Sequence, residues 1–162
     1  MPEPSLKFRD LKMSLAPLHH LAKKSPAAFK KALKTGAGQF LNWANNGSMG
    51  SSRKPPIRWG VLRGSASAFV GNELVDVFDI GIKAGAGERP TPARSHSAPP
   101  TTITWVWNTN YAWKMHEWTG GWGKFTRDDG NAGDKWLEEH LRTDEKALME
   151  VIRTEFHKAA GL

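Results

Sequence analysis

The pair His116-Glu117 comes nearer to metal chemistry than any other combination of residues in this chain. A zinc-binding helix carries two histidines four residues apart with a glutamate beside the first, so that both imidazoles reach one ion. The local sequence here is HEWTG, which has no second histidine at that spacing. His19 and His20 are adjacent, and adjacent side chains on a helix point in different directions. The sequence therefore predicts no metal site.

Neighbouring carboxylates occur at Asp128-Asp129 and Glu138-Glu139. Glycosidases need two carboxyl groups about 5–10 Å apart across a cleft and in unlike surroundings. Residues adjacent in the chain do not give that arrangement, so we interpret both pairs as solvated charge. Ser65 and Ser67 lie in RGSAS, which lacks the G-x-S-x-G pattern of a nucleophile elbow. The glycines at 85–87 are not followed by the G-K-[ST] of a phosphate loop. We therefore predict no catalytic residue and no cofactor.

Positive charge is concentrated in the first third of the chain. The net charge is +7 overall, with +9 in residues 1–60, zero in residues 61–133 and −2 in residues 134–162. Such a basic segment can face phosphate or an acidic protein surface, although a solvated helix face is the simpler interpretation. Single-strand binders also need aromatic side chains among the basic ones. Here the tryptophans cluster around 105–122 and at 136, so we expect only non-specific contact with double-stranded DNA.

The composition is that of one ordinary domain. The chain has 162 residues, of which 39% are hydrophobic, below the roughly 45–50% of typical globular proteins. Long polar loops or surfaces covered by a partner would explain the difference. The absence of cysteine excludes disulfides and thiolate metal sites. No apolar run reaches the length of a membrane span, and the first residues lack the apolar core of a secretory signal. Eight tryptophans suggest large buried or interface areas.

Two amphipathic helices are expected. The first covers residues 26–44, with Ser25-Pro26 as its N-cap and first turn and Asn45-Asn46-Gly47 as its end. Its apolar stripe consists of Phe29, Leu33, Ala37, Phe40 and Leu41. The second covers about 134–159 and can be capped by Asp134. Its apolar face consists of Leu137, Leu141, Leu148, Ile152, Phe156 and Ala159.

Strand patterns occur at 65–70, 73–82 and 101–108. Gly71-Asn72 is typical of a hairpin turn between the first two, and the third is rich in β-branched residues and tryptophan. All three are expected in one antiparallel sheet. Residues 1–13 form an N-terminal arm that is either a short strand or a loose lead-in, and 83–100 and 118–133 are long loops, the first of them flexible. The order of elements predicts a single α+β domain, with the sheet packed against an N-terminal and a long C-terminal helix.

Three short motifs follow one another along the chain. The first motif is PIRWGVLRGS at 56–65, which contains Gly60, Leu62, Arg63 and Ser65. The second is YAWKMHE at 111–117, which contains Tyr111, Ala112, His116 and Glu117. The third is GDKWLE at 133–138, which contains Trp136 and Leu137. Together they resemble the small neck, or tail-completion, proteins of long-tailed bacteriophages, a family that includes head–tail connector and minor capsid components. The family patterns are a proline followed by t-G-x-L-R-x-S, then Y-A-x-x-x-H-E, then G-x-K-F/W-L-E. This chain departs from them at Trp59 and in its loops at 83–100 and 118–133.

The resemblance covers roughly residues 14–160 and implies a structural virion protein rather than an enzyme. Its members assemble in the host cytoplasm into a ring around the DNA channel between capsid and tail. The implied partners are other copies of the chain and neighbouring neck, adaptor or tail-terminator proteins, with no membrane involved. The motif residues would then have structural roles. A tail-terminator ring protein and a non-specific nucleic-acid-binding module are the alternatives, and a cell-wall-degrading enzyme is a more distant one.

Overall fold

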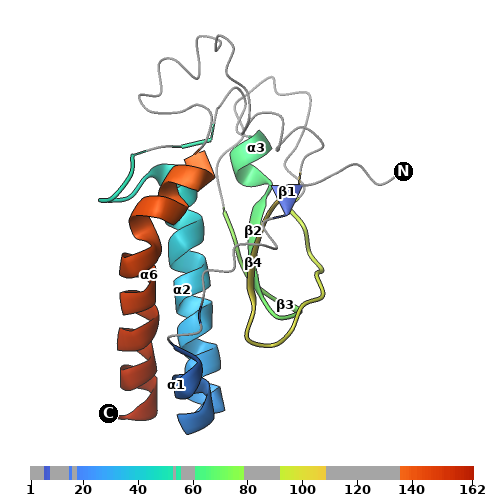
Figure 1. Ribbon diagram of the computed structural model, residues 1–162. Helices are drawn as coiled ribbons and strands as arrows, with labels where there is room; N and C mark the ends of the chain where they lie inside the picture. The colour runs from blue at the N-terminus through green and yellow to red at the C-terminus, as the bar shows by residue number, and fades with distance from the viewer. Residues whose placement is uncertain are drawn as a thin grey trace.

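The computed structural model describes residues 6–7, 15, 18–52, 54–55, 61–78, 92–108 and 136–162. The fold is α+β, as the sequence predicts: an antiparallel sheet with helices stacked on one side (Figure 1). The elements in chain order are β1 (Leu6–Lys7), α1 (His19–Lys24), α2 (Pro26–Asn46), α3 (Val61–Gly64), β2 (Ala66–Val70), β3 (Glu73–Val77), β4 (Ile103–Trp107) and α6 (Trp136–Ala160).

The sheet has the strand order β1-β4-β2-β3, and every neighbouring pair is antiparallel. The predicted hairpin is confirmed, because β2 and β3 are joined by a turn at 71–72. Gly71 has a φ of 59° there, a backbone conformation that favours glycine. The third predicted strand, β4, pairs with β2, and its Trp105 lies opposite Ala68. Every residue of β2 and β4 is buried, so both faces of these central strands are covered.

Helix α2 covers one face of the sheet. The Trp105 indole Nε1 donates a hydrogen bond of 2.8 Å to the carbonyl oxygen of Ala37, in the middle of α2. The Phe40 and Trp105 rings lie 4.5 Å apart between centroids. Figure 1 shows α2 between the sheet and α6. The prediction placed both long helices against the sheet, whereas α6 packs mainly on the far side of α2.

The segment at 92–102 covers the other face. The rings of His96 and Phe69 lie 5.4 Å apart between centroids, and the Gly71 amide donates to the carbonyl of Thr102 at 2.9 Å. This segment includes residues 92–100, the described part of the predicted flexible loop, which has no helix or strand. Residues 83–91, along with the second predicted loop at 118–133, lie outside the described residues.

The caps predicted for α2 are present. The Ser25 hydroxyl accepts a 3.3 Å hydrogen bond from the Ala28 amide, Pro26 opens the helix, and Gly47 follows its end with a φ of 90°. The helix runs two residues beyond the predicted 44, because Asn45 is buried and bonded within the core. Helix α6 ends at Ala160, close to the prediction, while the proposed cap Asp134 lies outside the described residues. The short helices α1 and α3 were not predicted, since each is too short to show an apolar period.

Tryptophan contributes mainly to the core in the described part of the chain. Trp105, Trp107 and Trp136 are among its largest fully buried side chains, and Trp43 packs partly buried beside them. Trp105, Trp107 and Trp136 are therefore not available for contacts with a neighbouring subunit, whereas Trp43 keeps part of its surface exposed. The other four, at positions 59, 113, 118 and 122, lie outside the described residues.

Candidate functional site

The first motif lies where the chain enters the sheet. Arg63, in α3, is 5% exposed, and its Nε and one terminal guanidinium nitrogen donate to the carbonyl oxygen of Pro55 at 3.0 and 2.7 Å. Ser65 is fully buried, and its carbonyl oxygen accepts from the Asn108 amide at 3.1 Å, directly before β2 pairs with β4. Both residues join the loop before α3 to the central strands, which is a structural role. Leu62 belongs to α3, but its side chain and Gly60 lie outside what the structure describes.

The third motif opens α6. Trp136 and Leu137 are its first two residues, and both are fully buried in the main core. They fix the start of α6 against the rest of the molecule. The second motif, with Tyr111, Ala112, His116 and Glu117, lies outside the described residues. Its assignment, including the absence of a metal at His116, stays a prediction.

A polar cluster, made of the half-buried Ser48 and the buried Asp144 and His140, was missed by the sequence analysis. His140 Nδ1 lies 2.6 Å from Asp144 Oδ2, and the two side chains are 0% and 3% exposed. The Ser48 hydroxyl lies 2.8 Å from each carboxylate oxygen of Asp144. The cluster connects the loop after α2 to the second turn of α6, two parts of the chain almost a hundred residues apart.

The loop that supplies Ser48 is closely packed around the carboxylate. The Ser48 amide donates to the Ser51 carbonyl at 2.6 Å, and the Ser51 amide donates back to the Ser48 hydroxyl at 3.0 Å. A Cβ on Gly50 would lie 2.5 Å from Asp144 Oδ1, so only glycine fits there. This turn leaves Met49 fully exposed at its tip.

Three residue types of a serine hydrolase thus meet in one cluster, but in the wrong order. In a hydrolytic triad the histidine lies between serine and aspartate and removes the hydroxyl proton. Here Asp144 lies in the middle and accepts from both Ser48 and His140. His140 and Asp144 are also shielded from solvent and hence from any substrate. The arrangement satisfies buried polar groups and does not activate a nucleophile.

Asn45 makes polar contacts between the end of α2 and the sheet. The Asn45 amide nitrogen donates to the Leu41 carbonyl at 2.8 Å, and its side-chain oxygen accepts from Trp107 Nε1 at 3.1 Å. The Phe40 and His140 rings meet edge to face with centroids 6.4 Å apart. Asn45 therefore ties β4 to α2 through polar contacts, and the Phe40 ring of α2 packs against His140 of α6.

The lysines of α2 fall into two groups. Lys30 and Lys34 reach Glu73 on β3, with Nζ–O distances of 3.0 and 2.6 Å. Hydrogen bonds from Lys34 and then Lys30 lower the pKa of the Glu73 carboxyl from its usual value. These two charges therefore hold α2 to the edge of the sheet. Lys31 is exposed and has no acidic partner among the described residues.

No group of three or more His, Cys, Asp or Glu side chains that could hold a metal occurs in the described part of the chain. No helix there is long and apolar enough to span a membrane.

Comparison with known proteins found no matching family model, no matching curated protein and no matching solved structure. The family resemblance therefore rests on the three motifs.

Proposed function

We propose that this protein is a structural virion subunit that forms a ring at the head–tail junction of a tailed bacteriophage, as a neck or tail-completion component. The observation that carries the proposal is the order of the three motifs in the sequence, together with the elements on which the described parts of the first and third motifs fall. PIRWGVLRGS at 56–65 leads through α3 into β2, and GDKWLE at 133–138 runs into the head of α6. These are the positions that the resemblance implies for them.

The side chains of the first and third motifs support a structural role. Arg63 and Ser65 make contacts within the fold, and Trp136 and Leu137 fill the core. The cluster that most resembles catalytic machinery, Ser48–Asp144–His140, is buried and has the wrong hydrogen-bond order. We therefore propose that the chain is not an enzyme and that it acts through contacts with other copies and with neighbouring neck or tail-terminator proteins.

The test is imaging of the purified protein and of the virion. Negative-stain images of the full chain at rising concentration should show closed rings of one symmetry. Immunogold labelling of phage particles that carry the gene should place the label between capsid and tail. Label at the tail tip, or a chain absent from virions and monomeric at every concentration, would contradict the proposal.

A tail-terminator ring protein is the nearest alternative. The same experiments distinguish it, because a terminator caps isolated tails whereas a neck subunit remains with filled heads. A non-specific nucleic-acid-binding module is the alternative from another class, and the net charge of +7 favours it. Such a module would bind DNA without forming a ring.

A further inference from the structure

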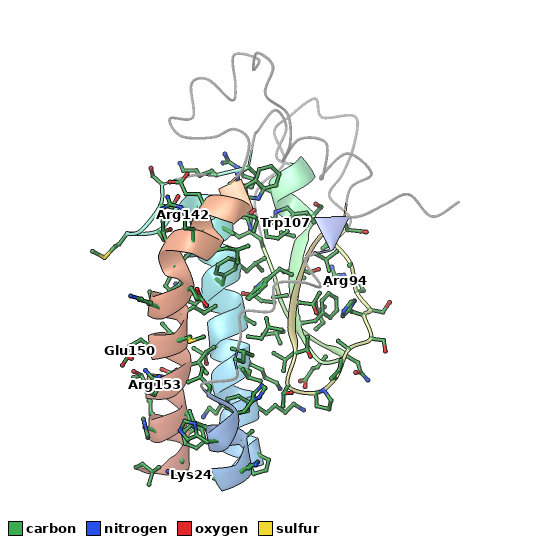
Figure 2. All side chains as sticks on the ribbon, in the orientation of Figure 1. Lys24, Arg94, Trp107, Arg142, Glu150 and Arg153 are labelled. Atoms are coloured by element: carbon green, nitrogen blue, oxygen red, sulfur yellow. The ribbon has the colours of Figure 1, made fainter. Side chains whose placement is uncertain are left out.

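Helix α1 presents a basic face to solvent. His19 and His20 are exposed, and so are Lys23 and Lys24 one turn later, so that each histidine stands four residues before a lysine on the same side. The opposite side is apolar, and Leu21 is buried there against the core. Figure 2 shows Lys24 at the end of the molecule where α1 joins the start of α2.

Lys31 adds a third exposed lysine in the second turn of α2. It lies about 7.5 Å along the helix axis from the first residue of that helix, at the standard rise per residue. We call His19, His20, Lys23, Lys24 and Lys31 the basic pole. None of its three lysines has an acidic partner among the described residues, in contrast to the lysines bound by Glu73.

The part of the chain that carries the basic pole has no acidic residues of its own. No aspartate or glutamate occurs between Asp10 and Glu73, and Glu73 is already engaged with two other lysines. Helix α6, by contrast, alternates acidic and basic side chains along its exposed surface, as in the Arg153–Glu150 pair. Positive charge is therefore concentrated at the α1 end of α2 and not spread evenly over the helices.

We propose that the basic pole binds the phosphate backbone of double-stranded DNA without reading its sequence. Lysine ammonium groups on an exposed helix suit phosphates, which they contact as point charges. The exposed residues of α1 are only His and Lys. Lysine can contact guanine edges as well as phosphates, so duplexes of several sequences distinguish the two modes. The inference names a partner for the proposed subunit, but it rests on this surface and not on ring formation.

Single-stranded DNA and acidic proteins fit the surface less well. Single-strand binders stack bases on exposed aromatic rings, and the tryptophans of the described core are buried. Protein interfaces need apolar anchors at their centre. Among the described residues, the exposed large hydrophobics are only Met49 and Leu162. Met49 follows the opposite end of α2, and Leu162 is a single side chain at the C-terminus, at the same end of the molecule as α1 (Figure 1). Duplex phosphate contact requires neither feature.

The number of phosphate contacts determines how strongly the affinity for duplex DNA should depend on salt concentration. Three phosphate contacts predict a slope of about −2.7 for log K against log salt, or a loss of about 40-fold in affinity between 50 and 200 mM salt. The experiment is a fluorescence-anisotropy titration of short labelled duplexes of several sequences with the full chain. Single strands of equal length and polyglutamate are the competing probes.

Two triple variants remove the same charge from different surfaces. The pole variant removes the three lysine charges of the basic pole through Lys23→Gln/Lys24→Gln/Lys31→Gln. The control variant removes three exposed cations elsewhere through Arg94→Gln/Arg142→Gln/Lys146→Gln. All six side chains are exposed, so both variants should fold, which circular dichroism verifies. We expect the pole variant to lose at least about tenfold in duplex affinity at 50 mM salt. It should also lose most of the slope of log K against log salt. The control variant should stay within about twofold of the unmodified chain.

Several results would overturn the inference. Equal losses in the two variants would show that only net charge matters. Polyglutamate bound as tightly as duplex would indicate an acidic protein partner, and tighter binding of single strands would indicate stacking elsewhere in the chain. Sequence-selective binding at 200 mM salt, or no duplex binding at 50 mM, would also reject the assignment. Rings seen without DNA binding would leave the proposed function standing while this inference fails.

Discussion

Asp144 is the residue on which two distant parts of the chain depend. It accepts hydrogen bonds from Ser48 in the loop after α2 and from His140 one turn earlier in α6. A buried carboxylate is costly unless its oxygens are satisfied, and here both oxygens have partners. Its removal would take one hydrogen-bond partner from each of Ser48 and His140, which costs more than the removal of one donor.

Replacement of Asp144 by alanine should therefore destabilise the fold more than Ser48→Ala. We expect Asp144→Ala to lower the free energy of unfolding by about 1–3 kcal/mol, with Ser48→Ala at the lower end of that range. Urea denaturation followed by tryptophan fluorescence measures both. Glu145→Ala is the matched control, since Glu145 is the next residue on α6 and is exposed. Its change should stay within about 0.5 kcal/mol, and equal effects of all three substitutions would contradict the structural role of Asp144.

Glu73 makes the contact between α2 and β3 sensitive to acid. Its carboxyl pKa is lowered by hydrogen bonds from Lys34 and Lys30, so the folded state holds the ionised form more strongly than the unfolded chain does. The resulting stability is present above the pKa of the unfolded carboxyl and is lost as the pH falls through the lower folded value. The exposed position keeps the effect small.

The stability of the Glu73→Gln variant can be compared with that of the unmodified chain at several pH values. The variant should be slightly less stable near pH 7, and the difference should shrink and vanish in acid, as the carboxyl of the unmodified chain becomes protonated. Thermal melts at several pH values measure it. Glu145→Gln, which removes an exposed carboxylate with no ion pair among the described residues, should show no such trend. A difference for Glu73→Gln that grows in acid would contradict the assignment.

At the scale of elements, close contact between α2 and α6 depends on small residues. A Cβ at Gly36 would lie 2.6 Å from Cγ1 of Ile152 and 3.4 Å from Leu148. Ile152 is β-branched and fully buried, so it has little freedom to move away. The sequence stripe from Phe29 to Leu41 predicts which side of α2 meets a core, but it does not reveal that α2 is covered on two sides.

Gly36→Ala should therefore destabilise the helix pair. Overpacking costs about 1–3 kcal/mol, and the better helix propensity of alanine returns only about 1 kcal/mol. Gly38→Ala is the control, because its Cβ would meet only the Asp76 side chain, 3.3 Å from Oδ2. That variant should be neutral or more stable in the same denaturation assay. A Gly36→Ala variant as stable as Gly38→Ala would show that α6 packs less closely than the structure indicates.

The sequence predicts the long elements well because each carries its own period and end signals. Ser25-Pro26 and Gly47 mark α2, and Gly71-Asn72 marks the hairpin, all through local chemistry. The sheet order is not predictable in this way, since nothing in the strand pattern indicates that β4 pairs with β2. One feature of the sequence does indicate the polar cluster. The apolar face of α6 is interrupted between Leu141 and Leu148, and Asp144 occupies the position where an apolar residue would be expected. Its partner Ser48 is distant in the chain, so only the fold brings them together.

On the scale of the whole molecule, the layers place different features at opposite ends of α2. The basic pole lies where α1 meets the start of α2, and the turn that exposes Met49 follows its end. The segment at 92–102 lies on the far face of the sheet, away from α6 (Figure 1). In the proposed ring, this arrangement would offer separate surfaces to DNA and to neighbouring copies.

Limited proteolysis tests this organisation in the intact chain. Proteases cut where the backbone opens locally without unfolding the core, so segments without helix or strand are cut first. Arg94 is exposed in such a segment, whereas Arg142 and Lys146 lie within the 25-residue helix α6. We expect trypsin to cut first within 83–100 and to leave a fragment that retains α6, as mass spectrometry would show. If the proposed ring forms, the same cut should slow in assembled particles, because loops that contact neighbours become protected. Early cleavage inside Trp136–Ala160 would contradict both the layer arrangement and the role of Trp136 and Leu137 in fixing that helix.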